Sequence, residues 1–440
     1  MRRKRTIAWK RAVAALFAAA VLACVGAGHA AAAVISVPAG GERLRDAIAA
    51  ATPGDVLELE VGVHYGPVLI DRPLTLEGRS GVVVDGAGRG RTIEVAAPDV
   101  TIRGLEVRGS GIDNAMDAGI YLDQKATNAR VEANLVIGNL VGVYVHGASG
   151  AILRGNTIIG RTDLRLNERG NGVYVWNAPG AQVIDNDISG GRDGIFTNAS
   201  RRNSFRGNRM HGVRFAMHYM YTNDSDVSDN VSVGNHAGYV IMFSDRLKIH
   251  GNVSRDDRDY GLLLNYANDS QIDDNVATGS QKCVFIYNAN KNVLTANRFA
   301  DCAIGIHFTA GSERNVVSGN AFVNNQTQVK YVGTRSIDWS EKGRGNYWSD
   351  NPAFDLNGDG IADAAYRPND LVDRVVWAYS AAKLLLNSPV VEVLRWAQSQ
   401  FPALHPGGVV DSAPLMTPPR VAPTLETARL RQREATDGRH

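Results

Sequence analysis

The chain has 440 residues, of which 21% are charged, and its formal net charge is +2. Removal of residues 1–33, interpreted below as an export signal, takes away six basic residues and leaves a net charge of −4. A mildly acidic chain without a basic stripe is a poor partner for nucleic acid. Beyond residue 33 no segment is long and apolar enough to span a bilayer.

Residues 1–33 have the composition of a secretory signal peptide. Six Lys and Arg residues lie within positions 2–11, an uncharged Ala/Val/Leu run follows to about Ala27, and small residues at 28–33 offer cleavage sites. Cys24 provides an alternative, the attachment of a lipid. Export predicts a location in the bacterial periplasm or outside the cell, and we expect the periplasm.

Residues 34–118 are expected to form an N-terminal cap and the first coils of the fold. A capping helix is predicted over Arg43–Ala50. Short strands are predicted at Leu57–Leu59, Leu74–Leu76 and Val82–Val84, where apolar residues cluster or alternate.

Within the region 119–331 one asparagine returns almost every 22 residues. The nine positions are Asn134, Asn156, Asn186, Asn208, Asn230, Asn252, Asn275, Asn297 and Asn320. A fixed period of this length, in a region rich in Gly, Asn and Asp, indicates stacked strands and turns rather than helix pairs. We therefore predict an all-β fold, a right-handed parallel β-helix solenoid, with the asparagines in a ladder at one bend. The single interval of 30 residues predicts a loop at Arg161–Gly170.

A second repeated pattern consists of a small residue, an apolar residue, any residue and another apolar residue. Because successive side chains of a strand alternate, the position after the small residue faces inward and the next faces outward. This register places Met217 and Tyr219 in the core and His218 and Met220 on the outer surface. Met242 has the position of Met220 in the following coil.

The exposed imidazole and thioethers of this region form a candidate copper site. Its predicted residues are His218, Met220, Met242, His211, Met210 and His236. Imidazole combined with thioether is a ligand set that suits Cu(I). The alternative is a surface rich in Met and aromatic residues that a partner protein covers.

Outward positions of successive coils are predicted to form two rows on one face. The first row is Tyr121, Tyr144, Tyr174, Phe196, His218, Val240, Leu263, Phe285 and His307, and the second includes His146, Trp176, Asn198, Met220, Met242, Asn265 and Tyr287. A strip of exposed apolar surface usually marks an interaction site. We expect partner docking through Tyr144, Tyr174, Trp176, Leu263 and Phe285.

Residues 332–419 are predicted to form a C-terminal segment that contains an acidic loop. Candidate calcium ligands occupy positions 1, 3, 5 and 9 of a calcium-loop pattern; they are Asp355, Asn357, Asp359 and Asp363. Position 12 is Tyr366 instead of the expected Glu. The alternative is a turn that caps its own backbone.

The end of this segment is expected to be helical and poor in charge. Helices are predicted over Val375–Leu386 and Pro389–Gln400, the second with proline in its first turn. Such helices must bury most of their surface on the solenoid or in another protein, and Trp377 and Trp396 are the expected docking residues. Residues 420–440 are expected to be disordered.

Two cysteines remain after the export signal. Cys283 takes the small-residue position of its coil, whereas Cys302 lies three residues before that position in the next coil. Because the two therefore occupy different rows, we expect buried small hydrophobic side chains, with a disulfide as the alternative in an oxidising compartment.

The chain resembles the NosD family of nitrous-oxide-reductase maturation proteins in the motifs His218–Asn223, Gly238–Ser244, Gly261–Asn265, Tyr366–Pro368 and Asp411–Met416. The resemblance covers the exported chain to about Pro419. It implies a periplasmic protein that binds the permease of an ABC transporter, and through it the ATPase subunits. It also implies a role in assembling the copper–sulfide centre of nitrous oxide reductase, with the reductase as client, a copper chaperone as further partner and copper as transient cargo. The resemblance supplies no catalytic residues.

The competing class is a carbohydrate-active β-helix enzyme, a polysaccharide lyase or epimerase. Such an enzyme requires carboxylates clustered with a Lys or Arg base on one outward face. The best match is Arg255–Asp259, which is more simply explained as a solvated turn, so we expect no catalytic site. The chain also has no P-loop motif, and nucleotide use is expected only in a partner.

Overall fold

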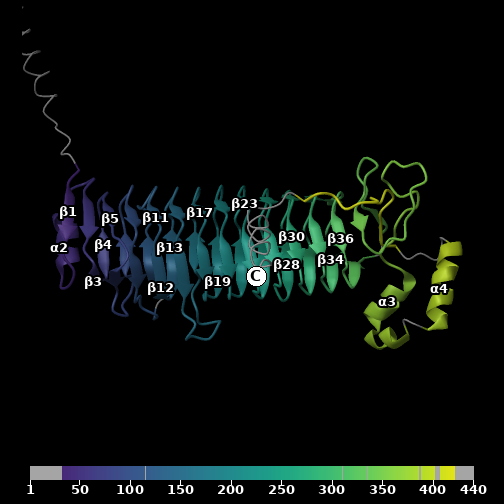
Figure 1. Ribbon diagram of the computed structural model, residues 1–440, viewed down its shortest axis with the longest axis horizontal. Coiled ribbons are helices and arrows are strands. Elements are labelled where there is room, and N and C mark those ends of the chain that lie inside the picture. The colour runs from purple at the N-terminus through teal and green to yellow at the C-terminus, as the bar shows by residue number, and fades with distance from the viewer. Residues whose placement is uncertain are drawn as a thin grey trace, which may run out of the picture.

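Each regular coil between the two ends contributes one short strand to each of three long sheets, and the coils stack into a rod with helices near its C-terminal end (Figure 1). The computed structural model describes residues 32–113, 115–309, 311–333, 335–385, 388–401 and 407–421. The predicted all-β solenoid is confirmed. Nearly all of the predicted signal peptide, 1–33, and of the predicted tail, 420–440, lies outside the described residues.

Two of the three sheets contain 13 strands each. Sheet A consists of β1 Val34–Val37, β2 Val56–Leu59, β5 Thr75–Glu77, β8 Thr101–Arg103, β11 Arg130–Glu132, β14 Ile152–Arg154, β17 Gln182–Ile184, β20 Ser204–Arg206, β23 Asp226–Ser228, β26 Lys248–His250, β29 Gln271–Asp273, β32 Val293–Thr295 and β35 Val316–Val317. Sheet B consists of β3 Gly62–Tyr65, β6 Val82–Asp85, β9 Glu106–Arg108, β12 Leu135–Asn139, β15 Thr157–Gly160, β18 Asp187–Ser189, β21 Arg209–His211, β24 Val231–Val233, β27 Val253–Arg255, β30 Val276–Thr278, β33 Arg298–Ala300, β36 Ala321–Val323 and β39 Tyr347–Trp348.

Sheet C has 12 strands. The strands in its middle are longer than those of the other two sheets. The 12 strands are β4 Val68–Ile70, β7 Ile93–Val95, β10 Ala118–Leu122, β13 Val141–His146, β16 Val173–Trp176, β19 Asp193–Asn198, β22 Phe215–Met220, β25 Ala237–Met242, β28 Tyr260–Asn265, β31 Lys282–Tyr287, β34 Ile304–Thr309 and β37 Thr327–Val332. Neighbouring strands pair in parallel, so equivalent positions of successive coils lie side by side. The predicted loop at 161–170 leaves the rod between β15 and β16.

The core fills the inside of the coils from one end of the rod to the other. One cluster of buried apolar side chains extends from Val37 in the first coil to Val409 beyond the last. On β22 the predicted alternation is observed: Met217 and Tyr219 are fully buried, and the residues between and after them face outward.

The predicted asparagine ladder lies at the bend between sheets A and B. The side-chain oxygen of Asn230 accepts hydrogen bonds from the backbone N–H and the side-chain Nδ2 of Asn208, at 3.0 and 2.9 Å. Nδ2 of Asn230 in turn donates to the backbone oxygen of Phe205. Beyond the predicted Asn320, the ladder continues to Asn346. Each coil thereby satisfies a buried polar group of its neighbour.

The N-terminal end agrees with the sequence expectations. Helix α2 spans Arg43–Ala50, as predicted, and buries Leu44 and Ile48 against the first coils. The strands predicted at Leu57–Leu59, Leu74–Leu76 and Val82–Val84 correspond to β2, β5 and β6, each within one residue at its ends.

The C-terminal end is closed by two segments that are far apart in sequence. β38 Ile337–Asp338 pairs with β40 Val409–Val410, and Tyr347 forms a bridge with Leu415. Tyr366 and Asp411 exchange two backbone hydrogen bonds of 2.9 Å. Residues 407–415 are therefore part of the solenoid's end.

The described residues 371–385 and 388–401 form a helical excursion between these two anchoring segments (Figure 1). It contains α3 Leu371–Ala378, a 3₁₀ helix Ser380–Leu385 and α4 Pro389–Gln400. The second predicted helix is confirmed. The first was predicted as one helix over Val375–Leu386. Its start is wrong, because a capping box of Asp370 and Asp373 begins α3 at Leu371, and α3 ends at Ala378 before the separate 3₁₀ helix.

A disulfide joins Cys283 and Cys302, so the expectation of two separate thiols is wrong. Cys283 lies at the start of β31 in sheet C, and Cys302 lies in the turn between β33 and β34 of the next coil. The turn of one coil lies over the strand start of the preceding coil, so two residues in different rows meet there.

Candidate functional site

The outer face of sheet C carries both predicted rows, in the predicted order. Strand pairing aligns the first row from Tyr121 to His307 and adds Lys330 in the last coil. The same pairing aligns the second row from His146 to Tyr287. This face therefore positions most of the side chains that the sequence singles out.

Ring stacking covers much of the first row. The ring centroids of Tyr144 and Tyr174 are 4.5 Å apart, those of Tyr174 and Phe196 are 4.8 Å apart, and the Arg91 guanidinium lies over Tyr121. Tyr144 is only 6% exposed, so its expected exposure as a docking residue is wrong. Burial raises the pKa of Tyr121 to about 12, which leaves this phenol neutral at physiological pH.

The other predicted docking residues of sheet C are accessible in part. Tyr174, Trp176, Leu263 and Phe285 each retain an intermediate exposure. The exposed apolar surface of this face is therefore smaller than the sequence predicts, because neighbouring side chains in a row partly cover one another.

At the centre of this face His218 contacts a buried carboxylate. Its Nδ1 lies 3.1 Å from Oδ2 of Asp193, which has no exposed surface in its side chain. Arg214 donates to both oxygens of the same carboxylate, at 2.8 and 2.7 Å. Burial raises the pKa of Asp193, but the hydrogen bonds from His218 and Arg214 outweigh burial and hold it below its ordinary value.

Three of the six predicted copper ligands share this outer face. Met220 and Met242 are paired across adjacent strands, and His218 precedes Met220 by two residues on the same face. His236 lies in the turn before β25 and is half-buried. In the part of the chain that the structure describes, no group of three or more His, Cys, Asp or Glu side chains is arranged to hold a metal, so this set depends on its thioethers.

The two remaining predicted ligands lie on sheet B. Met210 is fully buried in the core, so its assignment to a surface patch is wrong. His211 lies on the outer side of the same strand and pairs with Asp187 at 3.3 Å. The sequence placed both near His218 because they are close in the chain, but the bend between sheets B and C separates them.

Sequence reasoning missed an aromatic stack next to the two methionines. Tyr221, Phe243 and Tyr266 directly follow the outward positions of Met220, Met242 and Asn265, and their rings stack at 5.1 and 5.2 Å. All three adopt a left-handed backbone conformation with φ of 48–50°, which is uncommon for bulky residues. In the coils on either side this position is Ala199 and Asn288, so a comparison of coils reveals the stack.

The predicted calcium ligands mostly bond to their own loop. Both oxygens of Asp355 accept backbone N–H groups, from Gly358 and Gly360, and Asp363 accepts the N–H of Leu356. Asn357 and Asp359 are hydrogen-bonded to each other. The geometry is that of the self-capping turn, and calcium binding stays a prediction.

The carboxylates proposed for an enzyme do not form a cluster. Asp257 was interpreted as part of a solvated turn, which is wrong: it is fully buried and accepts hydrogen bonds from Ser232, Ser254 and the backbone of Asn235. Arg258 and Asp259 form an exposed ion pair outside the core. The carboxylates of Asp257 and Asp259 in this run therefore do not lie together on one outward face.

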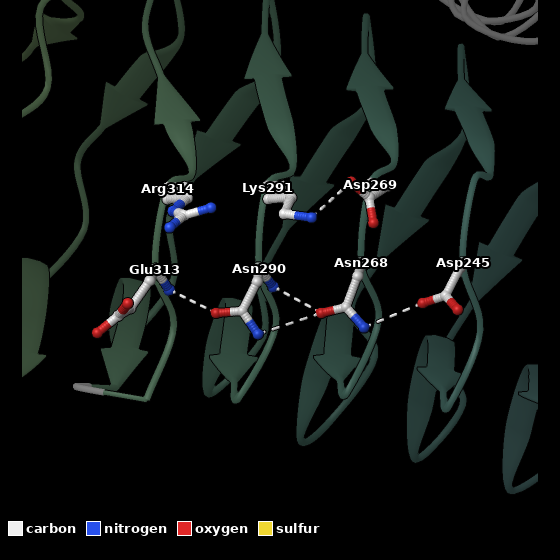
Figure 2. Close-up of a pocket in the computed structure, with 7 residues that line it drawn as sticks. All are labelled: Asp245, Asn268, Asp269, Asn290, Lys291, Glu313 and Arg314. Atoms are coloured by element: carbon white, nitrogen blue, oxygen red, sulfur yellow. Dashed lines mark hydrogen bonds and ion pairs between the residues drawn. The ribbon is translucent and has the colours of Figure 1, made fainter.

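A polar hollow of about 380 Å³ lies on the turns between sheets C and A. Figure 2 shows its seven lining residues: Asp245, Asn268, Asp269, Asn290, Lys291, Glu313 and Arg314. Nδ2 of Asn268 donates to Asp245, Nδ2 of Asn290 donates to Asn268, and Lys291 pairs with Asp269. Most of these groups satisfy one another, so the hollow is the outer surface of a structural ladder.

The helical excursion exposes an unusual number of large apolar side chains. Tyr379, Leu384, Leu385, Val390, Val393, Trp396 and Phe401 are all more than half exposed. The predicted docking residue Trp396 is among them, whereas Trp377 is half-buried.

Comparisons with known proteins support the resemblance seen in the sequence. Residues 155–353 match the family described as "Periplasmic copper-binding protein (NosD)". The "Probable ABC transporter binding protein NosD" of Stutzerimonas stutzeri is 41% identical over 377 residues, which is 82% of this chain and 86% of that protein. The protein of the same name from Pseudomonas aeruginosa is 39% identical and covers 83% of this chain and 89% of its own.

The chain belongs to the NosD family. Among solved structures, the NosD solenoid is similar to the PL6 family alginate lyase AlyGC, with a TM-score of 0.51 and 14% identity over 72% of this chain and 51% of that one. At this identity the likeness concerns the fold alone. In the described part of this NosD chain, none of the helices is long and apolar enough to cross a membrane.

Proposed function

We propose that the protein is a periplasmic accessory factor that docks on an ABC transporter and assists assembly of the copper–sulfide centre of nitrous oxide reductase. The observation that carries this proposal is the helical excursion, an apolar module inserted into an otherwise closed solenoid. Relatives at 41% and 39% identity are named ABC transporter binding proteins, which supports the same partner.

The excursion is not needed to close the solenoid. Its base is joined by the hydrogen bonds between Tyr366 and Asp411, and residues 407–415 complete the end of the rod. Leu384 is 89% exposed and Trp396 is 64% exposed. So much apolar surface is an aggregation liability unless a partner covers it. The proposed cover is the periplasmic side of the permease, whose ATPase subunits would hydrolyse the nucleotide.

The second part of the proposal concerns the cargo. His218, Met220 and Met242 would hold Cu(I) as transferred cargo, received from a copper chaperone and passed to the reductase. Imidazole and thioether suit the softness of Cu(I), and the paired methionines lie one strand apart, roughly 4.8 Å. The aromatic stack, in which Tyr221 and Tyr266 are exposed and Phe243 is partly buried, gives an exchanging partner apolar surface next to the patch.

The test replaces residues 371–406 by a short Gly/Ser linker between Asp370 and Gly407. This keeps Asp411 and β40 in place, so the variant should retain its β-rich circular dichroism and its melting transition. It should no longer copurify with the permease, and cells that contain it should make reductase without a mature copper–sulfide centre. Full copurification and maturation with a folded linker variant would contradict the proposal.

A point-substituted pair sharpens this test. Leu384→Asp combined with Trp396→Asp should weaken copurification with the permease, because an unpaired charge buried in an interface costs roughly 2–5 kcal/mol. The matched control is Leu356→Asp, at a leucine that is 85% exposed in the acidic loop. The control should copurify normally.

A further inference from the structure

We propose that Asp193 is a positioning residue, which presents Nε2 of His218 to a Cu(I) ion shared with the thioethers of Met220 and Met242. This inference rests on the copper role proposed above. It assigns a function to a buried carboxylate that lies one coil away from its histidine.

The first step is the tautomer of His218. Oδ2 of Asp193 lies 3.1 Å from Nδ1, so Nδ1 carries the proton and donates to the carboxylate. Nε2 then keeps its lone pair, and no described residue hydrogen-bonds to it. A histidine that ligates a metal commonly donates its other ring N–H to a carboxylate in this way, which raises its basicity as a ligand.

The second step is the orientation of the carboxylate. Arg214 binds both oxygens of Asp193, through Nε at 2.8 Å and Nη2 at 2.7 Å. This two-point contact fixes the plane of the carboxylate and balances its charge. The dyad is therefore set in place before any metal arrives.

The third step is the position of the imidazole ring. Phe196 stacks on its face at 4.6 Å, and Phe215 contacts it edge-on at 5.3 Å. Together with the hydrogen bond to Asp193, these contacts hold the ring on three sides. Only 12% of the His218 side chain is exposed, and Nε2 is the one ring nitrogen left for a ligand.

The same face provides two internal comparisons. His146 stacks on Trp176 and its buried Nδ1 has no partner, and neither ring nitrogen of His307 has one. Among the three histidines in the outward rows of sheet C, His218 is the one with a hydrogen-bonded carboxylate partner, and it lies two residues before Met220 on the same face. The Asp193–His218 pair and the two thioethers lie at the same place on this face, which favours a ligand role for His218 over a structural one.

The fourth step is the completion of the ligand set. Met220 lies two residues beyond His218 on the same face, and Met242 lies beside Met220 on the next strand. Long, flexible Met side chains can converge on one ion over such distances. One imidazole and two thioethers give a soft, three-coordinate site for Cu(I).

The experiment titrates Cu(I) against a chromophoric competitor with the full exported chain. Asp193→Asn should lower the Cu(I) affinity by about ten- to a hundredfold, as loss of such a partner does elsewhere. In the metal-free protein, ¹⁵N–¹H NMR should show the Nδ1–H tautomer of His218 in the native chain and a mixture in the variant. The matched control is Asp187→Asn, which removes the carboxylate of the exposed pair with His211 and should change neither readout.

The outcomes separate the two proposals. If the triple variant His218→Ala, Met220→Ala, Met242→Ala binds Cu(I) as well as the native chain, the copper proposal fails. If the triple variant loses binding while Asp193→Asn retains native affinity and tautomer, only the positioning role fails. Should Asp193→Asn not fold, Asp193→Glu replaces it: this variant keeps the charge but displaces the carboxylate, and native affinity there would overturn the inference.

Discussion

The indole Nε1 of Trp348 donates a 2.8 Å hydrogen bond to Oδ2 of Asp411, across 63 residues of sequence. The same oxygen accepts the backbone N–H of Asn346, the last asparagine of the ladder, at 2.6 Å. The carboxylate of Asp411 therefore takes the place that the next asparagine would have, and it fastens the returning chain to the last coil. The helical excursion is thus an insertion into the solenoid's cap.

We expect Asp411→Ala to destabilise the protein strongly. It leaves the buried N–H groups of Asn346 and Trp348 without acceptors, and each unsatisfied group costs about 1–3 kcal/mol. Urea denaturation should show a loss of free energy of unfolding of several kcal/mol. The exposed carboxylate of Asp338 accepts the backbone N–H groups of Ser340 and Ser412. Asp338→Ala should therefore lower the free energy of unfolding by about 1 kcal/mol or less. Equal losses in the two variants would contradict the role of Asp411.

The buried asparagine ladder of Asn230 should contribute more to stability than the half-buried ladder of Asn290. Asn230→Ala removes a fully buried amide with four hydrogen bonds and should cost about 2–4 kcal/mol. Asn290→Ala, in the half-buried ladder of Figure 2, should cost about 1 kcal/mol or less, because water replaces its partners. Chemical denaturation of both variants measures the difference, and a costlier Asn290→Ala would contradict it.

Acid should destabilise the protein through His307. Burial, with Lys330 and Lys282 nearby, lowers the pKa of His307 to about 4, whereas an unfolded histidine titrates near 6.5. The neutral folded form is therefore fully favoured above pH 6.5, and this stability is lost as the pH falls from 6.5 towards 4. When the pH falls from 7 to 4.5, the free energy of unfolding should decrease in both proteins. The decrease should be about 1–2 kcal/mol smaller for His307→Phe than for the native chain, after allowance for partial exposure.

The control for this pH experiment is His211→Phe. His211 is nearly half exposed and pairs with Asp187 at the surface. Its substitution should leave the pH dependence of unfolding close to that of the native chain. An equal effect of the two substitutions would show that acid acts through the surface charge as a whole.

Charged substitutions on the partly exposed strip should weaken association with the reductase. Trp176→Asp and Leu263→Asp replace outward side chains, so the coils should stay folded by circular dichroism. Pull-down with the reductase should fall, while Tyr65→Asp, at a tyrosine that is 49% exposed on sheet B, should behave as the native chain does. Normal association of the strip variants would place the client on another surface.

The aromatic stack of Tyr221, Phe243 and Tyr266 should contribute to partner binding but not to the stability of the fold. Tyr266→Asn installs the residue that the next coil has at this position, Asn288, where a φ of 50° costs tyrosine roughly 1 kcal/mol. We expect the melting temperature to stay or rise and the association with the copper-exchanging partner to fall. A melting temperature that drops by several degrees would show instead that the stack supports the fold.

The repeat made the fold and the register of sheet C predictable from the sequence. A ladder needs the same residue in every coil, so the recurring Asn marks the period, and strand alternation then places His218 and Met220 outside. Exposure was less predictable, because it depends on how rings such as Tyr144 and Tyr174 stack across coils. A single coil read alone contains no information on that contact.

The contacts that the sequence did not predict join residues at different positions of the repeat, or residues outside it. Cys283 and Cys302 occupy different positions of the repeat and meet because a turn lies over a strand start. Asp193 and His218 also differ in position, although an acidic residue one coil before an outward histidine is a signal that comparison of coils can detect. Asp411 returns to the last coil from outside the repeat altogether, and only the tertiary structure reveals it.

The paired hydrogen bonds between Tyr366 and Asp411 also have a mechanical consequence. They join the two segments that flank the helical excursion, and Asn369 next to it donates to the backbone oxygen of Val329 in the last coil. Parallel strand pairing continues from there along the rod. We therefore expect a partner that binds the helices to set the direction of the rod as well, because both parts meet at the same short junction.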